Sequence, residues 1–251
     1  MATTQKMYLG SDEIGITKFG KDGNTIRGAF KKQFNVDFIV VAGGGGGGDY
    51  SITGPSFGGG GGAGRYYTGS INEENVTSFS ITIGSGGSVE NDGGDSTFIG
   101  SGVVIRMNGG GRGADVDGSA NSGGCGGGGS TNNPSGAPAT NGGLTSDDDG
   151  IGFDGKDSSE GGAGGGDGIT WFNGTTYARG GTRSSTPSGA GSGGKGGTYY
   201  IGTPIAQPGR DGVVVLRYEG TVTKATGGTI TTIDGYTYHE FTSNGTFTFT
   251  G

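Results

Sequence analysis

One glycine-rich motif has the residue types of a phosphate-binding loop. The run GAGSGGKG at residues 189–196 nearly spells a P-loop, and its glycines also satisfy G-x-G-x-x-G. Both motifs need a strand before them and a helix after them, so that backbone N–H groups meet the phosphate. Here TRSSTPS precedes and GTYYIG follows, and Gly196 stands where a Ser or Thr would bind magnesium. We therefore expect no nucleotide and no other cofactor.

Acidic residues offer little support for a metal site. The segment GGRGAD at residues 110–115 fits the first six positions of a calcium-binding nonapeptide repeat, but Asp117 fills the apolar position and no second copy follows. Such sites need stacked repeats. The triplet Asp147, Asp148 and Asp149 is more typical of a solvated loop tip than of a cation site. We expect no bound metal.

The chain also has few residues suited to catalysis, because it contains only one histidine, His239. It offers no Ser/His/Asp or Cys/His set for nucleophilic catalysis. The carboxylates of Glu73 and Glu74 leave a carboxylate-only glycosidase as the remaining enzymatic alternative. We expect no catalytic residue and no enzymatic activity, and we expect a structural role for His239.

Aromatic residues beside the glycine blocks are the better candidates for binding. Aromatic side chains give a large contact area at low entropic cost, which suits glycan faces and the loops of outer-membrane proteins. In the alternative interpretation, they cover the ends and sides of the glycine body and supply apolar burial. Trp171 and Tyr177 flank a predicted hairpin tip, so we expect these two to be exposed. The receptor-binding candidates are Tyr66, Tyr67, Phe153, Trp171, Phe172, Tyr177, Tyr199 and Tyr200.

These aromatic residues must be positioned by a glycine-rich region that has few side chains. Residues 43–212 contain 56 of the 67 glycines, and each glycine loses more conformational freedom on ordering than any other residue. Two apolar runs, FIVVA at 38–42 and VVVLRY at 213–218, bracket this body and argue against disorder. Polyproline-II segments have three residues per turn and direct their N–H and C=O groups outward. Glycine segments packed side by side can therefore form hydrogen bonds with one another through these groups. We predict a polyglycine bundle.

Strand patterns interrupt and flank the glycine blocks. Residues 38–41 form a continuous apolar run, which predicts a strand buried on both faces. Alternation over residues 75–84 predicts a strand with Phe79, Ile81 and Ile83 on one face. Residues 95–111 predict one or two strands, and ITWFNGTTYARGG at 169–181 predicts a hairpin around an Asn-Gly turn. The predicted fold is all-β, in which short strands clamp a glycine-rich sandwich of polyproline-II helices, with essentially no α-helix.

The tail TIDGYTYHEFTSNGTFTFTG is predicted to form a second hairpin. A three-residue loop at 243–245 would pair Phe241 with Phe247 and His239 with Phe249, which makes one apolar face. A two-residue loop would place Phe241 on the face opposite Phe247. We accordingly divide the chain into an N-terminal attachment segment at 1–35, a glycine-rich bundle domain at 36–218 and a C-terminal β-hairpin at 219–251.

Charge and hydropathy limit the classes of partner. A net charge of −7 disfavours nucleic acid, because neutralising phosphates needs a clustered Lys/Arg surface. No apolar run of about 18 residues is long enough for membrane insertion. The first 16 residues lack the apolar core of a signal peptide, so we expect synthesis in a cytoplasm and no export by that route. The single cysteine, Cys125, cannot form an intrachain disulfide.

The order of motifs resembles a known family. FIVVAGGGGGG, GGGGGAG, a strand ending in TIG, GGDSTF, further glycine blocks and GVVVLRY occur in that order over residues 36–218. This order resembles the glycine-rich domain of bacteriophage tail-fibre and tail-tip proteins, and it is similar to the polyglycine-sandwich adhesins of T-even-type phages. The leader KMYLGSDEI resembles segments common in phage tail proteins. In the family a hairpin like FTSNGTFTFT precedes the first glycine run, whereas here it follows the body.

The resemblance implies a virion protein of the tail, made in the host cytoplasm. It would be a tail-fibre tip adhesin that presents surface loops to a bacterial receptor, either an outer-membrane protein or a glycan. Other virion proteins would bind through the N-terminal segment and the strands, and a homo-oligomer is compatible with this role. One alternative is a purely structural protein of tail or head without a receptor role. A weaker alternative is an ice-binding protein, which needs regular Thr or Ala faces that the sequence does not show.

Overall fold

The computed structural model describes residues 7–9, 12–14, 34–49, 56–73, 78–100, 102–132, 135–138, 164–198 and 205–250. The described residues contain antiparallel strands and no helix, as predicted, and so none that could span a membrane. The strands are β1 (Met7–Leu9), β2 (Asp12–Ile14), β3 (Phe34–Val41), β4 (Tyr66–Glu73), β5 (Ser78–Thr82), β6 (Ser96–Gly100), β7 (Val103–Met107), β8 (Asp167–Thr170), β9 (Thr176–Arg179), β10 (Val213–Glu219), β11 (Ala225–Thr226), β12 (Thr229–Ile233), β13 (Tyr236–Phe241) and β14 (Gly245–Phe249).

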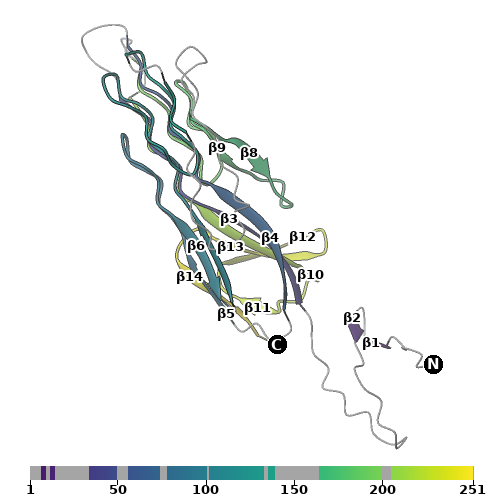
Figure 1. Ribbon diagram of the computed structural model, residues 1–251. Helices are drawn as coiled ribbons and strands as arrows, with labels where there is room; N and C mark the ends of the chain where they lie inside the picture. The colour runs from purple at the N-terminus through teal and green to yellow at the C-terminus, as the bar shows by residue number, and fades with distance from the viewer. Residues whose placement is uncertain are drawn as a thin grey trace, which may run out of the picture.

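Two five-stranded antiparallel sheets form a β-sandwich (Figure 1). The first sheet has the order β12-β13-β10-β3-β4, and the second has the order β11-β14-β5-β6-β7. Two-stranded pairs, β1-β2 and β8-β9, lie outside these sheets. The first sheet therefore brings the two apolar runs that bracket the glycine body together at its centre, as the pair β3 and β10.

Aromatic side chains fill the space between the two sheets. Phe98 of β6 stacks on Phe79 of β5, with ring centroids 4.4 Å apart, and lies 5.1 Å from Phe38 of β3. Phe79 and Ile81 are buried while the residues between them are exposed, which confirms the predicted alternation. Residues 95–111 supply two strands, β6 and β7, joined at Gly102.

The outer face of the first sheet carries a second apolar cluster. Ile39 and Val41 of β3 point to this side, whereas Phe38 and Val40 point between the sheets, so β3 is buried on both faces as predicted. The β8-β9 hairpin covers part of this outer face through Trp171. That hairpin turns at Asn173 and Gly174, also as predicted, and Gly174 has the positive φ of 75° that the turn requires.

The predicted C-terminal hairpin was wrong. β13 pairs with β10 and β12 in the first sheet, whereas β14 pairs with β11 and β5 in the second. Residues 242–244 carry the chain across from one sheet to the other, and Asn244 accepts a hydrogen bond from the Ile83 N–H (2.8 Å). This arrangement gives each strand two partners, which an isolated hairpin would not. Phe241 and Phe247 still share one apolar core, as predicted, although their strands do not pair with each other.

The glycine segments continue the strands beyond one end of the sandwich (Figure 1). Residues 43–48 follow β3, and their N–H groups donate to three neighbouring segments in strict rotation. Every third residue returns to the same neighbour. The donor and acceptor pairs are Gly43 to Gly94, Gly44 to Arg210, Gly45 to Gly62, Gly46 to Asn91, Gly47 to Gln207 and Gly48 to Gly59, at 2.8–3.0 Å.

The carbonyl groups of the same run follow the same period of three. They accept from three further segments, so residues 43–48 are bonded on all sides by six neighbours. The acceptor and donor pairs are Gly43 from Gly110, Gly44 from Gly87, Gly45 from Gly194, Gly46 from Gly113, Gly47 from Glu90 and Gly48 from Gly197. A period of three is what a polyproline-II helix requires. The polyproline-II conformation itself stays a prediction, which this period supports.

Close approach explains why this run must be glycine. A Cβ at Gly46 would lie 1.9 Å from the Ser88 carbonyl oxygen, and one at Gly47 would lie 1.9 Å from the Lys195 carbonyl oxygen. Both obstacles are backbone atoms, which cannot rotate away as side chains can. The glycine segments are therefore held by main-chain hydrogen bonds where other proteins use apolar side chains.

His239 of β13 ties the first sheet to Gly227, in the link between β11 and β12. Its side chain is fully buried, with Nδ1 2.7 Å from the Gly227 carbonyl and Nε2 3.2 Å from the Tyr218 hydroxyl. Because a carbonyl only accepts, we assign the proton to Nδ1, so Nε2 accepts from Tyr218. The Tyr218 hydroxyl in turn accepts from the Lys224 N–H (2.9 Å). These contacts are those of a structural histidine.

Stability is expected to fall as pH is lowered through the range of histidine titration. Burial lowers the pKa of His239 below its usual 6.5, and the hydrogen bond to Gly227 opposes this shift only in part. Because the unfolded chain binds this proton more readily, the buried neutral His239 contributes stability at pH values above 6.5. That contribution is lost as the pH falls through the lower pKa of the folded protein. Urea unfolding at about pH 7.5 and about pH 5.5 measures the loss. A His239→Phe variant should lack this pH dependence; an equal slope in both proteins would contradict the assignment.

Candidate functional site

The structure separates the aromatic candidates into buried and exposed side chains. Tyr66, Trp171 and Tyr177 are only 3–6% exposed, within the cluster on the outer face of the first sheet. The expected exposure of Trp171 and Tyr177 was therefore wrong. Tyr67 is half-buried against the core of the sandwich. Phe172, by contrast, is 59% exposed. Phe153, Tyr199 and Tyr200 lie outside the described residues.

Local hydrogen bonds fix the conformation of the hairpin tip. The Trp171 N–H donates to the Thr175 carbonyl (3.0 Å), and the Gly174 N–H donates to the Trp171 carbonyl (2.9 Å). The Asn173 amide donates to the Tyr177 hydroxyl (2.7 Å). Burial raises the pKa of Tyr177, so its phenol stays protonated. Trp171 then packs edge-on against Tyr238, which explains why a tip expected to be exposed contributes its largest side chain to the core.

Arg217 of β10 lies at the centre of an aromatic patch beside this tip. Its guanidinium carbon is 3.3 Å from the ring centroid of Phe172 and 4.4 Å from that of Tyr236. Its Nε donates to Asp37 Oδ2 (3.0 Å), and the Ser70 hydroxyl donates to Asp37 Oδ1 (2.7 Å). We call these five residues, Phe172, Arg217, Tyr236, Asp37 and Ser70, the Phe172–Arg217 patch.

Phe172 is the one residue of this patch that was predicted from the sequence. Arg217 and Asp37 are charged residues inside otherwise apolar strands, and they are direct cross-strand neighbours. A charge within a buried strand was the signal that could have found them, because such a residue needs a partner on the same face. Pairing Arg217 with Asp37, however, requires the register of β3 and β10, which the sequence does not provide.

The patch has the chemistry of a binding surface. A cation over aromatic rings is held without many flexible bonds, and an exposed ring offers apolar contact area. Among the described residues, the terminal nitrogens of Arg217 have no hydrogen-bond partner, so they remain available as donors. The Arg217–Asp37 ion pair cancels most of the local charge. The patch therefore suits a neutral polar ligand with an apolar face, such as a sugar, better than an anion.

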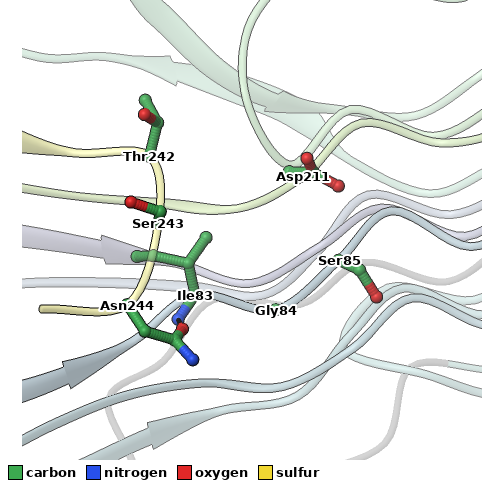
Figure 2. A pocket seen from close by; sticks show the side chains of 7 residues that line it. All are labelled: Ile83, Gly84, Ser85, Asp211, Thr242, Ser243 and Asn244. Atoms are coloured by element: carbon green, nitrogen blue, oxygen red, sulfur yellow. Dashed lines mark hydrogen bonds between the residues drawn. The ribbon is translucent and has the colours of Figure 1, made fainter.

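A shallow hollow at the junction of sandwich and glycine body is a second candidate site (Figure 2). Its volume is about 440 Å³, and it is lined by Ile83, Gly84, Ser85, Asp211, Thr242, Ser243 and Asn244. Figure 2 shows the 242–244 loop apart from Asp211 and Ser85. Asp211 accepts a hydrogen bond from the Gly86 N–H (2.7 Å), and Asn244 accepts one from the Ile83 N–H. Both polar side chains are therefore already bonded to backbone groups. No aromatic residue lines the hollow, and the Phe172–Arg217 patch is the stronger candidate.

Metal-binding side chains do not gather elsewhere in the described part of the chain. No group of three or more His, Cys, Asp or Glu residues is placed there to hold a metal ion. The single cysteine, Cys125, is buried.

Fold and patch together define an all-β protein in which a sandwich carries a hydrogen-bonded body of glycine segments. The chain belongs to the glycine-rich domain family, whose model matches residues 25–219. Comparison with curated proteins and with solved structures gives no match.

Proposed function

We propose that this protein is a bacteriophage tail-fibre tip adhesin that binds a bacterial surface receptor. The resemblance of the motif order to phage tail proteins supports the virion assignment, which the glycine-rich family alone does not define. The observation that carries the adhesive role is Phe172, which is 59% exposed and held 3.3 Å over Arg217. A ring fixed in this way loses little conformational freedom on binding.

The glycine body supports the same proposal through its stiffness. Residues 43–48 within it are bonded to neighbours on all sides, so the body can present a surface with little ordering cost when a receptor binds. We propose binding rather than catalysis as the activity, with an outer-membrane protein or a glycan as the receptor and other virion proteins as structural partners. A structural virion protein without a receptor role is the alternative that the experiment below separates.

Phe172→Ala is expected to weaken adhesion without unfolding the protein. Removing an exposed ring should cost about 1 kcal/mol of stability or less, chiefly the lost contact with Arg217. As a binding hot spot, the same ring should be worth about 2 kcal/mol, or about 30-fold in affinity. The measurement is binding of labelled protein to a panel of Gram-negative cells, with smooth and truncated lipopolysaccharide strains compared.

Val222→Ala is the matched control, because Val222 is 72% exposed and lies outside the patch. It should bind cells like the original protein. Equal binding by Phe172→Ala and the original would remove the patch from the proposal. Failure of the original protein to bind any strain, together with its presence in assembled phage particles, would favour the structural alternative.

A further inference from the structure

Strand β12 is an unprotected edge of the first sheet. It has the sequence TITTI, and all five residues are exposed, including Ile230 at 42% and Ile233 at 39%. The strand contains no charge, no proline and no glycine, and each of its residues is β-branched, which favours strand pairing. Natural edge strands are usually blunted by charged residues, proline, bulges or short length. None of these devices protects β12.

Two of the other three edges of the two sheets carry such protection. β7 contains Arg106, and β11 is only two residues long. β4, the remaining edge, buries Tyr66 and Ile71, so among the edge strands of the two sheets only β12 has every residue exposed.

The hairpin turn fixes which backbone groups of β12 face outward. Asp234 and Gly235 form a two-residue loop with positive φ values of 49° and 83°, which defines a type I′ turn between Ile233 and Tyr236. The residues flanking such a turn exchange both hydrogen bonds, and the pattern alternates along an antiparallel pair. Thr231 and Thr229 are then bonded to β13 as well. Ile230 and Thr232 direct their N–H and C=O groups to the free edge.

We propose that β12 pairs with β12 of a second copy of this chain. Ile230 and Thr232 lie symmetrically about Thr231, so a two-fold axis beside Thr231 places Ile230 opposite the partner's Thr232. The two pairs would form four main-chain hydrogen bonds and join the first sheets of both copies into one continuous sheet. This is the one register in which all five residues of β12 lie opposite a residue of the partner's β12.

Charge and burial favour a second copy as the occupant. With no charged residue in β12, the two strands meet without like-charge repulsion. At the ends of the pair, Asp234 lies opposite the partner's Gly228, away from any other carboxylate on the edge. Ile233 gains the partner's Thr229 as a cross-strand neighbour, and Ile230 gains the partner's Thr232. Both isoleucines therefore lose part of their exposed area.

The two-fold axis of an antiparallel pair runs perpendicular to the sheet, so both copies present the same face on the same side. Under the proposed function, two Phe172–Arg217 patches would then face one cell surface. Two linked weak sites bind more tightly than either alone. The pairing itself does not depend on the adhesive role, and it is tested without any receptor.

Thr231→Cys tests the register directly. Opposed residues at a non-hydrogen-bonded position have Cα atoms about 4.5 Å apart, within the range of a disulfide. Oxidation should therefore give a dimer that withstands denaturing electrophoresis and returns to monomer on reduction. Thr232→Cys is the matched control, because its copies are diagonal neighbours about 7–8 Å apart and should not cross-link. The buried Cys125 stays in both variants.

Thr232→Pro tests whether the free edge of β12 joins two copies of the chain in solution. Proline removes only the outward N–H at this position, so the β12-β13 hairpin should persist and the far-UV circular dichroism spectrum should stay unchanged. The original protein should have twice the monomer mass by light scattering, and Thr232→Pro should halve it. A monomeric original protein at every concentration would overturn the proposal. So would a dimer that Thr232→Pro leaves intact or that Thr231→Cys does not cross-link.

Discussion

Gly46→Ala is expected to disrupt the glycine body. The added methyl group would lie 1.9 Å from the Ser88 carbonyl oxygen and 2.7 Å from its carbon, well inside van der Waals contact. Residues 43–48 are bonded to neighbours on all sides, so a shift that relieves this clash must break several hydrogen bonds at once. We expect a loss of at least about 3 kcal/mol, the upper end of overpacking costs. Urea unfolding followed by circular dichroism measures it.

Gly102→Ala is the control for this substitution. Gly102 has a positive φ of 80°, and a Cβ there would meet nothing within 4 Å. Only the left-handed backbone opposes alanine, at about 1–2 kcal/mol. A loss at Gly46 no greater than that at Gly102 would show that the segments yield easily, and the close-packed body would then be the wrong description.

Phe98→Ala is expected to destabilise the sandwich by about 3–5 kcal/mol, as for other buried phenylalanines. Phe98 is fully buried between the sheets, and its ring contacts Phe79 of the second sheet and Phe38 of the first. Its removal therefore opens a cavity at the point where the two sheets meet. Thermal and urea unfolding measure the loss.

Val104→Ala is the matched control for Phe98→Ala, because Val104 lies on the same β6-β7 hairpin but is 52% exposed. Its substitution should change the free energy of unfolding by about 0.5 kcal/mol or less. Similar losses at Phe98 and Val104 would contradict the placement of the core between the two sheets.

Local patterns in the sequence predicted the elements that depend on local chemistry. Alternation in β5, the continuous apolar run of β3 and the Asn173-Gly174 turn each specify their own structure within a few residues. Pairing over long distances was less accessible. Phe241 and Phe247 were expected to face each other across a hairpin, but each strand has other partners far away in the chain. The burial of one face constrains the side chains without deciding which strands pair.

The candidate site shows the same division. Phe172 could be selected as an aromatic residue at a turn, but exposure depends on how the tip folds. Trp171, its neighbour, is buried against Tyr238. Arg217 and Asp37 meet across two strands that are 180 residues apart, so the ion pair follows from tertiary register. The sequence therefore indicated the kind of side chain but not the surface to which it belongs.

The glycine body is held by main-chain hydrogen bonds that repeat every three residues, and this has a thermodynamic consequence. Burying apolar surface gives unfolding a large positive heat capacity change, whereas exposing peptide groups contributes with the opposite sign. Residues 43–48 are glycines bonded through main-chain groups and have no apolar side chains to bury, so such segments add little to the heat capacity change of unfolding. The free energy of unfolding of the glycine body should vary with temperature along a flatter curve than that of an ordinary core. Cold, which weakens apolar burial, leaves such a body largely unaffected.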